Sequence, residues 1–346
     1  MVDTDSHIKK QLKNWVSIVS KYQTPNVGRA VWQMINTILP FVGLWVLMYF
    51  SLKLNWSYLI TAGLGLVNGL FLVRVFIIQH DCGHRSFFKN QKANQIVGYV
   101  LSFFSSIPFK YWAKTHAFHH GHNGQLEHTN VGDIKTLSVE EFDQLSWFQK
   151  LRYRLFRNPI ILFGVGPIYY LAVSCRWPLI KYEGWKRLLT NLTINNLLIG
   201  LFYVGLALLV GWQKFLLIQI PILLVFGIVA LWFFYVQHQH EETYKQWQTK
   251  WDYLLSAIKG STYYKLPGLL NWFSGNIGFH HIHHLNPNIP NYNLPKCANE
   301  NPILQEYTTT LTLRESFKCV FHHLWDEKKQ RMISFWEYRK MKRVAA

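Results

Sequence analysis

The sequence has few of the residues that build a secreted or nucleotide-binding protein. Only four cysteines occur among its 346 residues, at positions 82, 175, 297 and 319. They are far apart and form no CxxC pair, so they make neither a zinc ribbon nor an iron–sulfur cluster, and nothing suggests a secreted disulfide scaffold. No GxGxxG motif is present to open a nucleotide-binding fold. The N-terminus, MVDTDSHIKKQLKNW, lacks an apolar h-region, so we expect no cleavable signal peptide.

Charge is missing from four long stretches of the chain. Residues 31–52, 54–73, 188–213 and 215–236 contain no Lys, Arg, Asp or Glu. A helix needs about 20 apolar residues to cross the hydrocarbon core of a bilayer. We therefore expect a single-domain, all-α integral membrane protein over residues 1–346, the alternative being a large soluble core of buried helices. The expected transmembrane helices cover approximately residues 31–52, 57–77, 190–211 and 215–236.

The links between these segments predict the topology. KLNWS joins the first pair and GWQK joins the second, so each pair is expected to form a helical hairpin. Of the 36 basic residues, only Lys53 and Lys214 fall on the hairpin tips. Because Lys and Arg are enriched on the cytoplasmic side, both termini and all histidine clusters are expected to be cytoplasmic. A net charge of +18 then suits contact with anionic lipid head groups or an acidic protein partner, and not with nucleic acid.

Two shorter apolar stretches, residues 93–109 and 159–175, have 17 residues each. They are marginal for spanning a bilayer, and we interpret them as re-entrant or interfacial helices of a cytoplasmic helical cap. If one of them crossed the membrane, the two hairpin tips would lie on opposite faces. The basic residues would then not sort to one side, which favours the non-crossing topology.

Histidine is concentrated in short clusters between and after the apolar stretches. HDCGH covers residues 80–84, HAFHH covers 116–120 and HHIHH covers 280–284, while QHQH contains His238 and His240. Spacings of three and four residues place side chains on one face of a helix. The histidines with this spacing are His80 and His84, then His116, His119 and His120, then His280, His283 and His284. Those that fall outside these faces are His122, His128, His240 and His281.

The patterned histidines predict a site for two metal ions. Neutral imidazole is a common ligand of iron, zinc and copper, and one ion accepts only about four to six ligands. The HExxH of a metalloprotease and the Glu-x-x-His of carboxylate-bridged di-iron proteins are both absent. An all-histidine site beside lipid indicates redox chemistry on an apolar substrate, although such a site also binds zinc. A metal transporter is the alternative from another class, but it would place ligands or charges in the middle of its spans.

The three histidine clusters, in this order with two after the first hairpin and one after the second, resemble the membrane fatty acid desaturase family from about residue 30 to about residue 340. HDCGHRSFF and HHLNPNIPNYNL are similar to its acyl-lipid branch, which acts toward the methyl end of the chain. The link GHNGQLEH after the second cluster is longer than is usual in the family. The resemblance implies a non-haem di-iron centre that activates O2 and introduces a cis double bond into a lipid-bound acyl chain. The implied iron ligands are His80, His84, His116, His119, His120, His238, His280, His283 and His284.

The resemblance also implies partners and a close alternative. The chain carries no electron carrier of its own, so a ferredoxin or a small b-type cytochrome with its reductase must supply electrons. Hydroxylases, acetylenases and other lipid oxygenases share the histidine clusters and are the nearest alternative. Polar neighbours are expected to orient metal-binding imidazoles through the free ring N–H. The candidates for this role are Asp81, Asp133, Glu241, Asn276 and His281.

Overall fold

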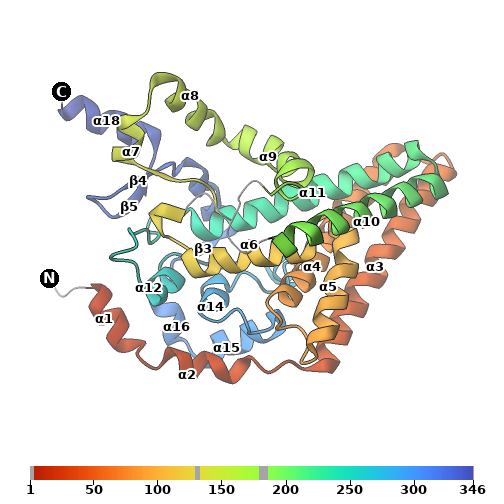
Figure 1. Cartoon of the computed structure of the whole chain (residues 1–346), viewed down its shortest axis with the longest axis horizontal. Coiled ribbons are helices and arrows are strands. Elements are labelled where there is room, and N and C mark those ends of the chain that lie inside the picture. Colours follow the sequence, from red (N-terminus) through yellow and green to blue (C-terminus); the bar gives the residue numbers. More distant parts are fainter. Residues whose placement is uncertain (1–3, 129–132, 179–185, 346) are drawn as a thin grey trace.

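The computed structural model describes residues 4–128, 133–178 and 186–345, and four long helices dominate it. Each of the four is long and apolar enough to cross a membrane, and together they form two hairpins whose tips lie at the same end of the molecule (Figure 1). The prediction of an all-α membrane protein with four spans is therefore confirmed. These helices are α3 (Val27–Lys53), α4 (Tyr58–Gly83), α10 (Lys186–Val210) and α11 (Trp212–His238).

The helices extend beyond the boundaries expected from the sequence. α4 continues to Gly83 instead of ending near residue 77, so the first histidine cluster lies on its last turn. α11 begins at Trp212, and Gly211 (φ 87°) alone separates it from α10. The prediction that the four residues GWQK link these two helices was therefore wrong. Polar residues such as Gln79 and Asp81 are buried inside the protein, 0% and 1% exposed. Because the protein and not lipid surrounds these side chains, the helix is not limited to its apolar run.

α4 is the central helix and packs against α3, α5 and α11. At Gly69 a Cβ atom would lie 2.5 Å from the Cβ of Val225 on α11, so this close crossing requires a glycine. The outer faces of the hairpins are apolar and exposed, for example at Leu59 (81%) and Leu208 (82%). Exposed leucines on helices of this length are suited to contact with lipid tails.

Shorter helices lie in the segment that connects the two hairpins. α5 (Gln91–Ser105) has 15 residues and is about 22 Å long, less than the bilayer core of about 30 Å. α6 (Phe109–His122) follows a left-handed residue, Ser106 (φ 58°), and Pro108. α8 (Trp147–Phe156) is bent by 62° against the next helical segment, in which π-helical turns flank α9 (Gly166–Tyr169). These turns are Ile161–Val165 and Tyr170–Ser174.

The remaining elements form the end of the molecule that carries both termini (Figure 1). The helices are α1 (Thr4–Gln11), α2 (Trp15–Val19), α7 (Val139–Gln144), α12 (Tyr253–Ile258), α13 (Gly268–Phe273), α14 (His280–Leu285), α15 (Leu294–Glu300), α16 (Ile303–Glu306), α17 (Leu313–Ser316) and α18 (Phe335–Ala345). Short 3-10 turns are η1 (Ser20–Tyr22), η2 (Leu126–His128), η5 (Asn291–Asn293) and η6 (Phe317–Phe321).

Five strands of two or three residues, which the sequence did not predict, pair within this end. The middle strand of one sheet, β4, is parallel to β1 and antiparallel to β5. In the second sheet β2 is parallel to β3, with Tyr264 opposite Leu311. The strands are β1 (Leu137–Ser138), β2 (Tyr263–Lys265), β3 (Thr310–Thr312), β4 (Leu324–Asp326) and β5 (Arg331–Ile333).

The core of this end surrounds the third histidine cluster. Ile282 and Leu285 of α14 pack with Ile8 and Leu12 of α1 in one apolar cluster. At Gly278, two residues before α14, a Cβ atom would lie 2.4 Å from the carbonyl oxygen of Tyr264. This glycine allows the chain to pass β2 closely and then enter α14 with its histidines directed inward.

Candidate metal centre

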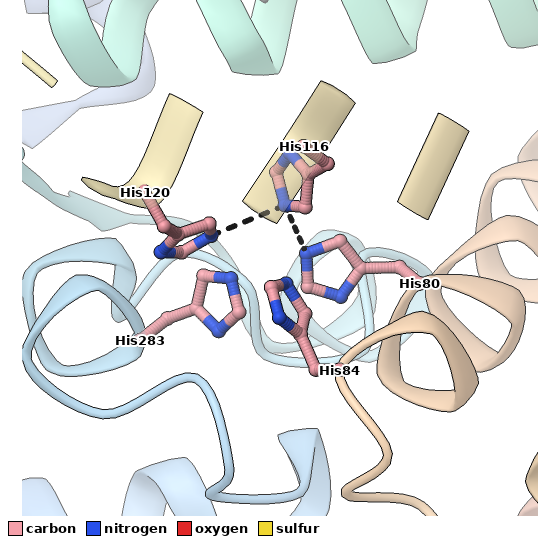
Figure 2. Close-up of side chains that lie close together, drawn as sticks. All are labelled: His80, His84, His116, His120 and His283. Carbon is pink, nitrogen blue, oxygen red and sulfur yellow. Dashed lines mark hydrogen bonds between the residues drawn. The ribbon is translucent and has the colours of Figure 1, made fainter. Parts of the chain in front are cut away.

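Five histidines from three helices converge in one group, which we call the five-histidine cluster (Figure 2). Its ligand nitrogens all lie within 4.8 Å of one another. The Nε2 atom of His116 is 3.0 Å from Nε2 of His80 and 3.2 Å from Nε2 of His120. The members are His80 and His84 at the end of α4, His116 and His120 on α6, and His283 on α14.

Four further histidines form a second group, the four-histidine cluster. The ligand nitrogens of His119, His238 and His284 lie within 4.8 Å of one another. Nε2 of His238 is 3.2 Å from Nε2 of His119 and 2.9 Å from Nε2 of His280. Nε2 of His280 is also 3.2 Å from Nε2 of His284, which makes His280 the fourth member. All nine histidines implied as ligands by the family resemblance thus lie in one cluster or the other.

Helical geometry explains how α6 and α14 serve both clusters. On α6, His116 and His120 are four residues apart and point to the five-histidine cluster, whereas His119 points to the other. Successive residues of a helix are rotated by about 100°, so residues 119 and 120 aim in different directions. The rings of His120 and His284 stack with centroids 4.1 Å apart, and so the two clusters are adjacent.

Two Nε2 atoms of the five-histidine cluster lack a hydrogen-bond partner among the described residues. Burial, reinforced by the neighbouring imidazoles, lowers the pKa of His84, His120 and His283 well below the usual range, so the rings are neutral. Nε2 of His84 and Nε2 of His283 have no hydrogen-bond partner among the described residues. A buried nitrogen without a partner is costly. Two ligand atoms that each lie about 2.1 Å from one metal ion, with a right angle between the two bonds, are about 3 Å apart. The Nε2 atoms of each cluster have separations of about this size, so the donor set fits two metal ions.

Hydrogen bonds behind the rings orient two of the histidines. Nδ1 of His80 lies 3.1 Å from Oδ1 of Asp81, and Nδ1 of His238 lies 3.0 Å from the carbonyl oxygen of Gly260. Both oxygens can only accept, so each ring donates through Nδ1. The lone pair of Nε2 is therefore directed into the cluster in both cases, as a metal ligand requires.

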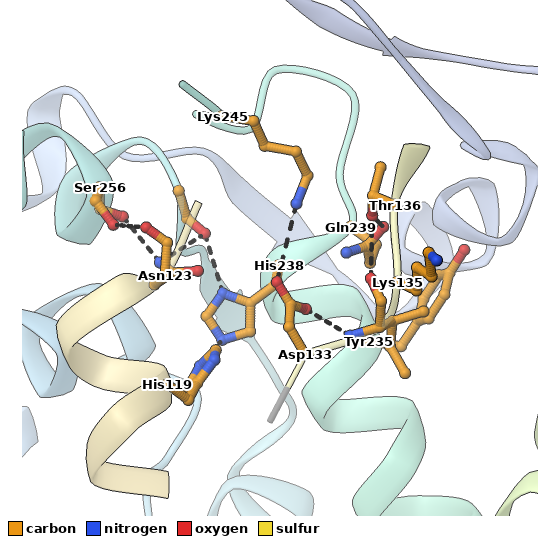
Figure 3. Close-up of polar contacts among 12 residues, drawn as sticks. His119, Asn123, Asp133, Lys135, Thr136, Tyr235, His238, Gln239, Lys245 and Ser256 are labelled. Carbon is orange, nitrogen blue, oxygen red and sulfur yellow. Dashed lines mark hydrogen bonds and ion pairs between the residues drawn. The ribbon is translucent and has the colours of Figure 1, made fainter. Parts of the chain in front are cut away.

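Asp133 lies beside His238 of the four-histidine cluster, and none of its described hydrogen bonds is with a clustered ring (Figure 3). Its Oδ2 atom is 4.0 Å from Nζ of Lys245, and both side chains are buried. Its Oδ1 atom accepts a hydrogen bond of 2.6 Å from the backbone of Ile134. Burial and the charge of Lys245 lower the pKa of His119 to about 3.

The other predicted orienting residues contact other parts of the protein. Glu241 forms an ion pair of 2.6 Å with Arg331. Asn276 is left-handed (φ 61°) and donates to the backbone oxygen of Asn291, 3.3 Å away. Among the described contacts, neither side chain hydrogen-bonds a clustered histidine.

Histidines outside the predicted helix faces also lie outside both clusters. His281 is fully buried on α14, but its ring faces Tyr263, with centroids 6.2 Å apart. Nε2 of His240 lies 3.0 Å from the carbonyl oxygen of Lys259. The rings of His122 and His128 contact Phe118. These positions agree with the separation of histidines by helix face.

Residues that the sequence did not single out complete the surroundings. Asn291 hydrogen-bonds Asp81, Lys245 lies beside the four-histidine cluster, and Gly260 supplies a carbonyl to His238. The polar run NPNIPNYNL after the third cluster could have indicated Asn291, because asparagines between prolines seldom build a plain helix. No sequence signal marks the carbonyl of Gly260, since every residue has one.

The fold and the clusters define a class of protein: a helical membrane protein with two adjacent histidine clusters, able to bind metal, at one end of its long helices. Residues 54–314 match the family model described as fatty acid desaturase. The chain belongs to the fatty acid desaturase family. It is therefore an oxidoreductase of the kind that introduces double bonds into fatty acyl chains.

Curated relatives agree with this assignment. A fatty acid desaturase of Bacillus subtilis is 41% identical over 332 residues, which cover 96% of this chain and 92% of that protein. An sn-1 oleoyl-lipid 12-desaturase of Synechocystis is 25% identical and is matched over 92% of this chain and 85% of its own. An sn-1 acyl-lipid omega-3 desaturase (ferredoxin) of Synechocystis is 27% identical over 70% of this chain and 67% of its own.

Proposed function

We propose that this protein is an acyl-lipid desaturase in which the nine clustered histidines hold two iron ions at the cytoplasmic face of the membrane. The observation that carries the proposal is the convergence of nine histidine rings, seven of them buried and two half-buried, into two adjacent groups. One first-row ion accepts about four to six ligands, so five and four histidines suit two ions. No carboxylate ligand is needed to complete either set.

The acyl-lipid substrate is supported by the relatives and by the surroundings of the site. Relatives from Synechocystis are described as acting on oleoyl-lipid and acyl-lipid substrates. α4 and α11 run from the apolar bundle directly into the clusters, ending at Gly83 and His238. A lipid-bound chain in the bilayer is therefore close to the site without leaving its apolar surroundings.

Within this centre the protein would position groups and exclude water. Bound iron would supply the activation of O2 and the removal of two hydrogens from adjacent methylenes. Asp81 and the carbonyl of Gly260 hold protons on Nδ1 of His80 and His238, which keeps their Nε2 atoms free. The burial of every ring in α14 excludes bulk water from the reacting groups.

An external protein supplies the electrons in this proposal, either a ferredoxin or a small b-type cytochrome with its reductase. The description of one relative names ferredoxin as its donor. The chain has a net charge of +18, which favours the approach of an acidic carrier. Reconstitution with each purified donor would identify the one that supports turnover.

The proposed topology places both termini and both clusters on the cytoplasmic side. Figure 1 shows the termini at the end opposite the hairpin tips. Cysteines introduced at Lys10 and at Asn55, both exposed, report on the two ends. An impermeant maleimide added to intact cells should label Asn55→Cys and not Lys10→Cys, and the reverse pattern would refute the orientation.

The activity is tested by expression in a host that lacks polyunsaturated lipids. Mass spectrometry of the lipids should show acyl chains lighter by two hydrogens, with new double bonds at one position. Products heavier by one oxygen would instead assign the chain to the hydroxylases. A His283→Ala variant at matched expression should form neither product, which links the activity to the histidine clusters.

A further inference from the structure

The first histidine cluster and the loop after the third are connected through one buried asparagine. We infer that Asn291 is a positioning residue that fixes the ring tautomer of His80 by holding the carboxylate of Asp81. This inference rests on the proposed role of His80 as a metal ligand. Asn291 lies more than 200 residues after Asp81 in the sequence, and it would help to orient a ligand of the five-histidine cluster.

Asp81 accepts hydrogen bonds from two sides. Oδ2 of Asp81 accepts from the backbone N–H of Asn291 at 2.6 Å and from Nδ2 of Asn291 at 2.9 Å. Oδ1 lies 3.1 Å from Nδ1 of His80. All three residues are buried, Asp81 and Asn291 each at 1% exposed and His80 at 4%. In this environment the carboxylate cannot rotate without losing bonds that water would not replace.

Asn291 is itself held in one orientation. Its Oδ1 atom accepts a hydrogen bond of 3.0 Å from Nε2 of Gln33 on α3. The amide NH2 of Asn291 therefore points to Asp81 and its oxygen points to Gln33. The backbone oxygen of Asn291 also accepts from Nδ2 of Asn276 at 3.3 Å. These contacts connect a span, two loops and the first cluster in one network.

The network determines what an amide at position 81 would do. Both groups that Asn291 directs at Oδ2 are donors, so an amide at this position must turn its oxygen to Asn291. Its NH2 would then face Nδ1 of His80 and force that nitrogen to accept. The proton of the ring would move to Nε2, where it would block metal binding. Alanine at position 81 imposes no such tautomer, so Asp81→Asn should be more harmful than Asp81→Ala.

Exchanging the two side chains tests this mechanism directly. In the double variant Asp81→Asn/Asn291→Asp, the carboxylate at position 291 can accept from the amide at position 81. The amide can then present its oxygen to Nδ1 of His80, but the backbone N–H of residue 291 loses its acceptor, so the tautomer is restored only in part. Asn291→Asp alone would place two buried carboxylates next to each other, and their charges would repel. A rescue by exchange is not expected if Asn291 only fills space.

The measurement is Co²⁺ binding to metal-free protein, followed by its visible absorption, with metal per chain after reconstitution. A lost orienting contact weakens a metal site by about 10–100-fold. We expect Asp81→Asn to lose affinity in this range, Asp81→Ala to lose less, and the exchange variant to regain part of the loss. Thermal unfolding in detergent checks that the variants remain folded.

Asn293 provides a matched control in the same short turn. Its side chain contacts Arg29 and the backbone of Tyr22, and none of its described contacts is with Asp81. Asn291→Ala should weaken Co²⁺ binding and Asn293→Ala should not, a comparison that also decides the question if the exchange variants do not fold. Equal effects of the two alanines, or equal binding by Asp81→Ala and Asp81→Asn, would overturn the inference. Wild-type protein without bound metal, or unchanged binding by His80→Ala, would instead refute the proposed function.

Discussion

The two histidine clusters share their ligand type but differ in the groups behind the rings. In the five-histidine cluster, Nδ1 of His80 faces the carboxylate of Asp81. In the four-histidine cluster, Nδ1 of His238 faces the neutral carbonyl of Gly260, and burial, with a smaller effect of the charge of Lys245, lowers the pKa of His119. A carboxylate that accepts from a ring increases the basicity of its Nε2 more than a neutral carbonyl does. The difference teaches that two metal sites built from one residue type need not be equivalent.

The largest expected effect is the loss of a cluster member. His280→Ala, His283→Ala or His284→Ala should lower metal content and abolish desaturation, because each removes a ligand nitrogen. His281→Ala, on the same helix but outside both clusters, should keep its metal and much of its activity. Iron per chain and acyl product yield at matched expression check this. If His281→Ala were as inactive and metal-poor as the others, the separation by helix face would be refuted.

A smaller effect is expected from the buried pair behind the four-histidine cluster. Lys245→Met leaves Asp133 buried without its counter-charge, so we expect a loss of stability of about 3–5 kcal/mol. Asp133→Asn/Lys245→Met removes both charges and should recover most of it. Thermal unfolding of the single and double variants measures the coupling. A double variant less stable than the single one would show that the two charges do not compensate each other.

The comparison of the clusters predicts two metal affinities. A titration with chelator should remove the ion of the four-histidine cluster first. We expect this at an about 10-fold lower chelator concentration, which corresponds to a difference in binding free energy of about 1.4 kcal/mol. His238→Ala and His84→Ala each remove a ligand from one cluster. Each variant should lack one of the two steps of metal loss, which assigns that step to its cluster. Simultaneous loss of both ions in the wild type would indicate that the clusters are equivalent or fully coupled.

The last expected effect is a pH dependence that arises outside both clusters. Burial lowers the pKa of His281 from 6.5 to about 3 in the folded protein. Below pH 6.5 the unfolded chain binds a proton here that the folded protein does not, so stability falls as the pH falls toward 3. His281→Gln should make this decline shallower by about 1.4 kcal/mol per pH unit between about pH 6 and 4. An unchanged slope would show that His281 titrates alike in both states.

Much of this arrangement could be predicted from the sequence because it depends on local patterns. Four uncharged stretches are sufficient to predict four spans, since a long apolar helix has few alternatives to a bilayer. Spacings of three and four residues separated the clustered histidines from His281 and His240, because helix geometry alone decides which residues share a face. The ends of the spans were less predictable, because α4 continues as a helix through buried polar residues to Gly83.

Other features are decided only when distant parts of the chain meet. Which histidine joins which cluster depends on how α4, α6, α11 and α14 pack, and the sequence order does not contain this information. The partner of Asp81 is Asn291, and the partner of His238 is the carbonyl of Gly260. A hydrogen bond depends on distance and direction between two atoms, and these are set by tertiary packing. The sequence by itself determined the residue types, the membrane helices and the helix faces, whereas only the tertiary structure decided the grouping of the ligands and the contacts that orient them.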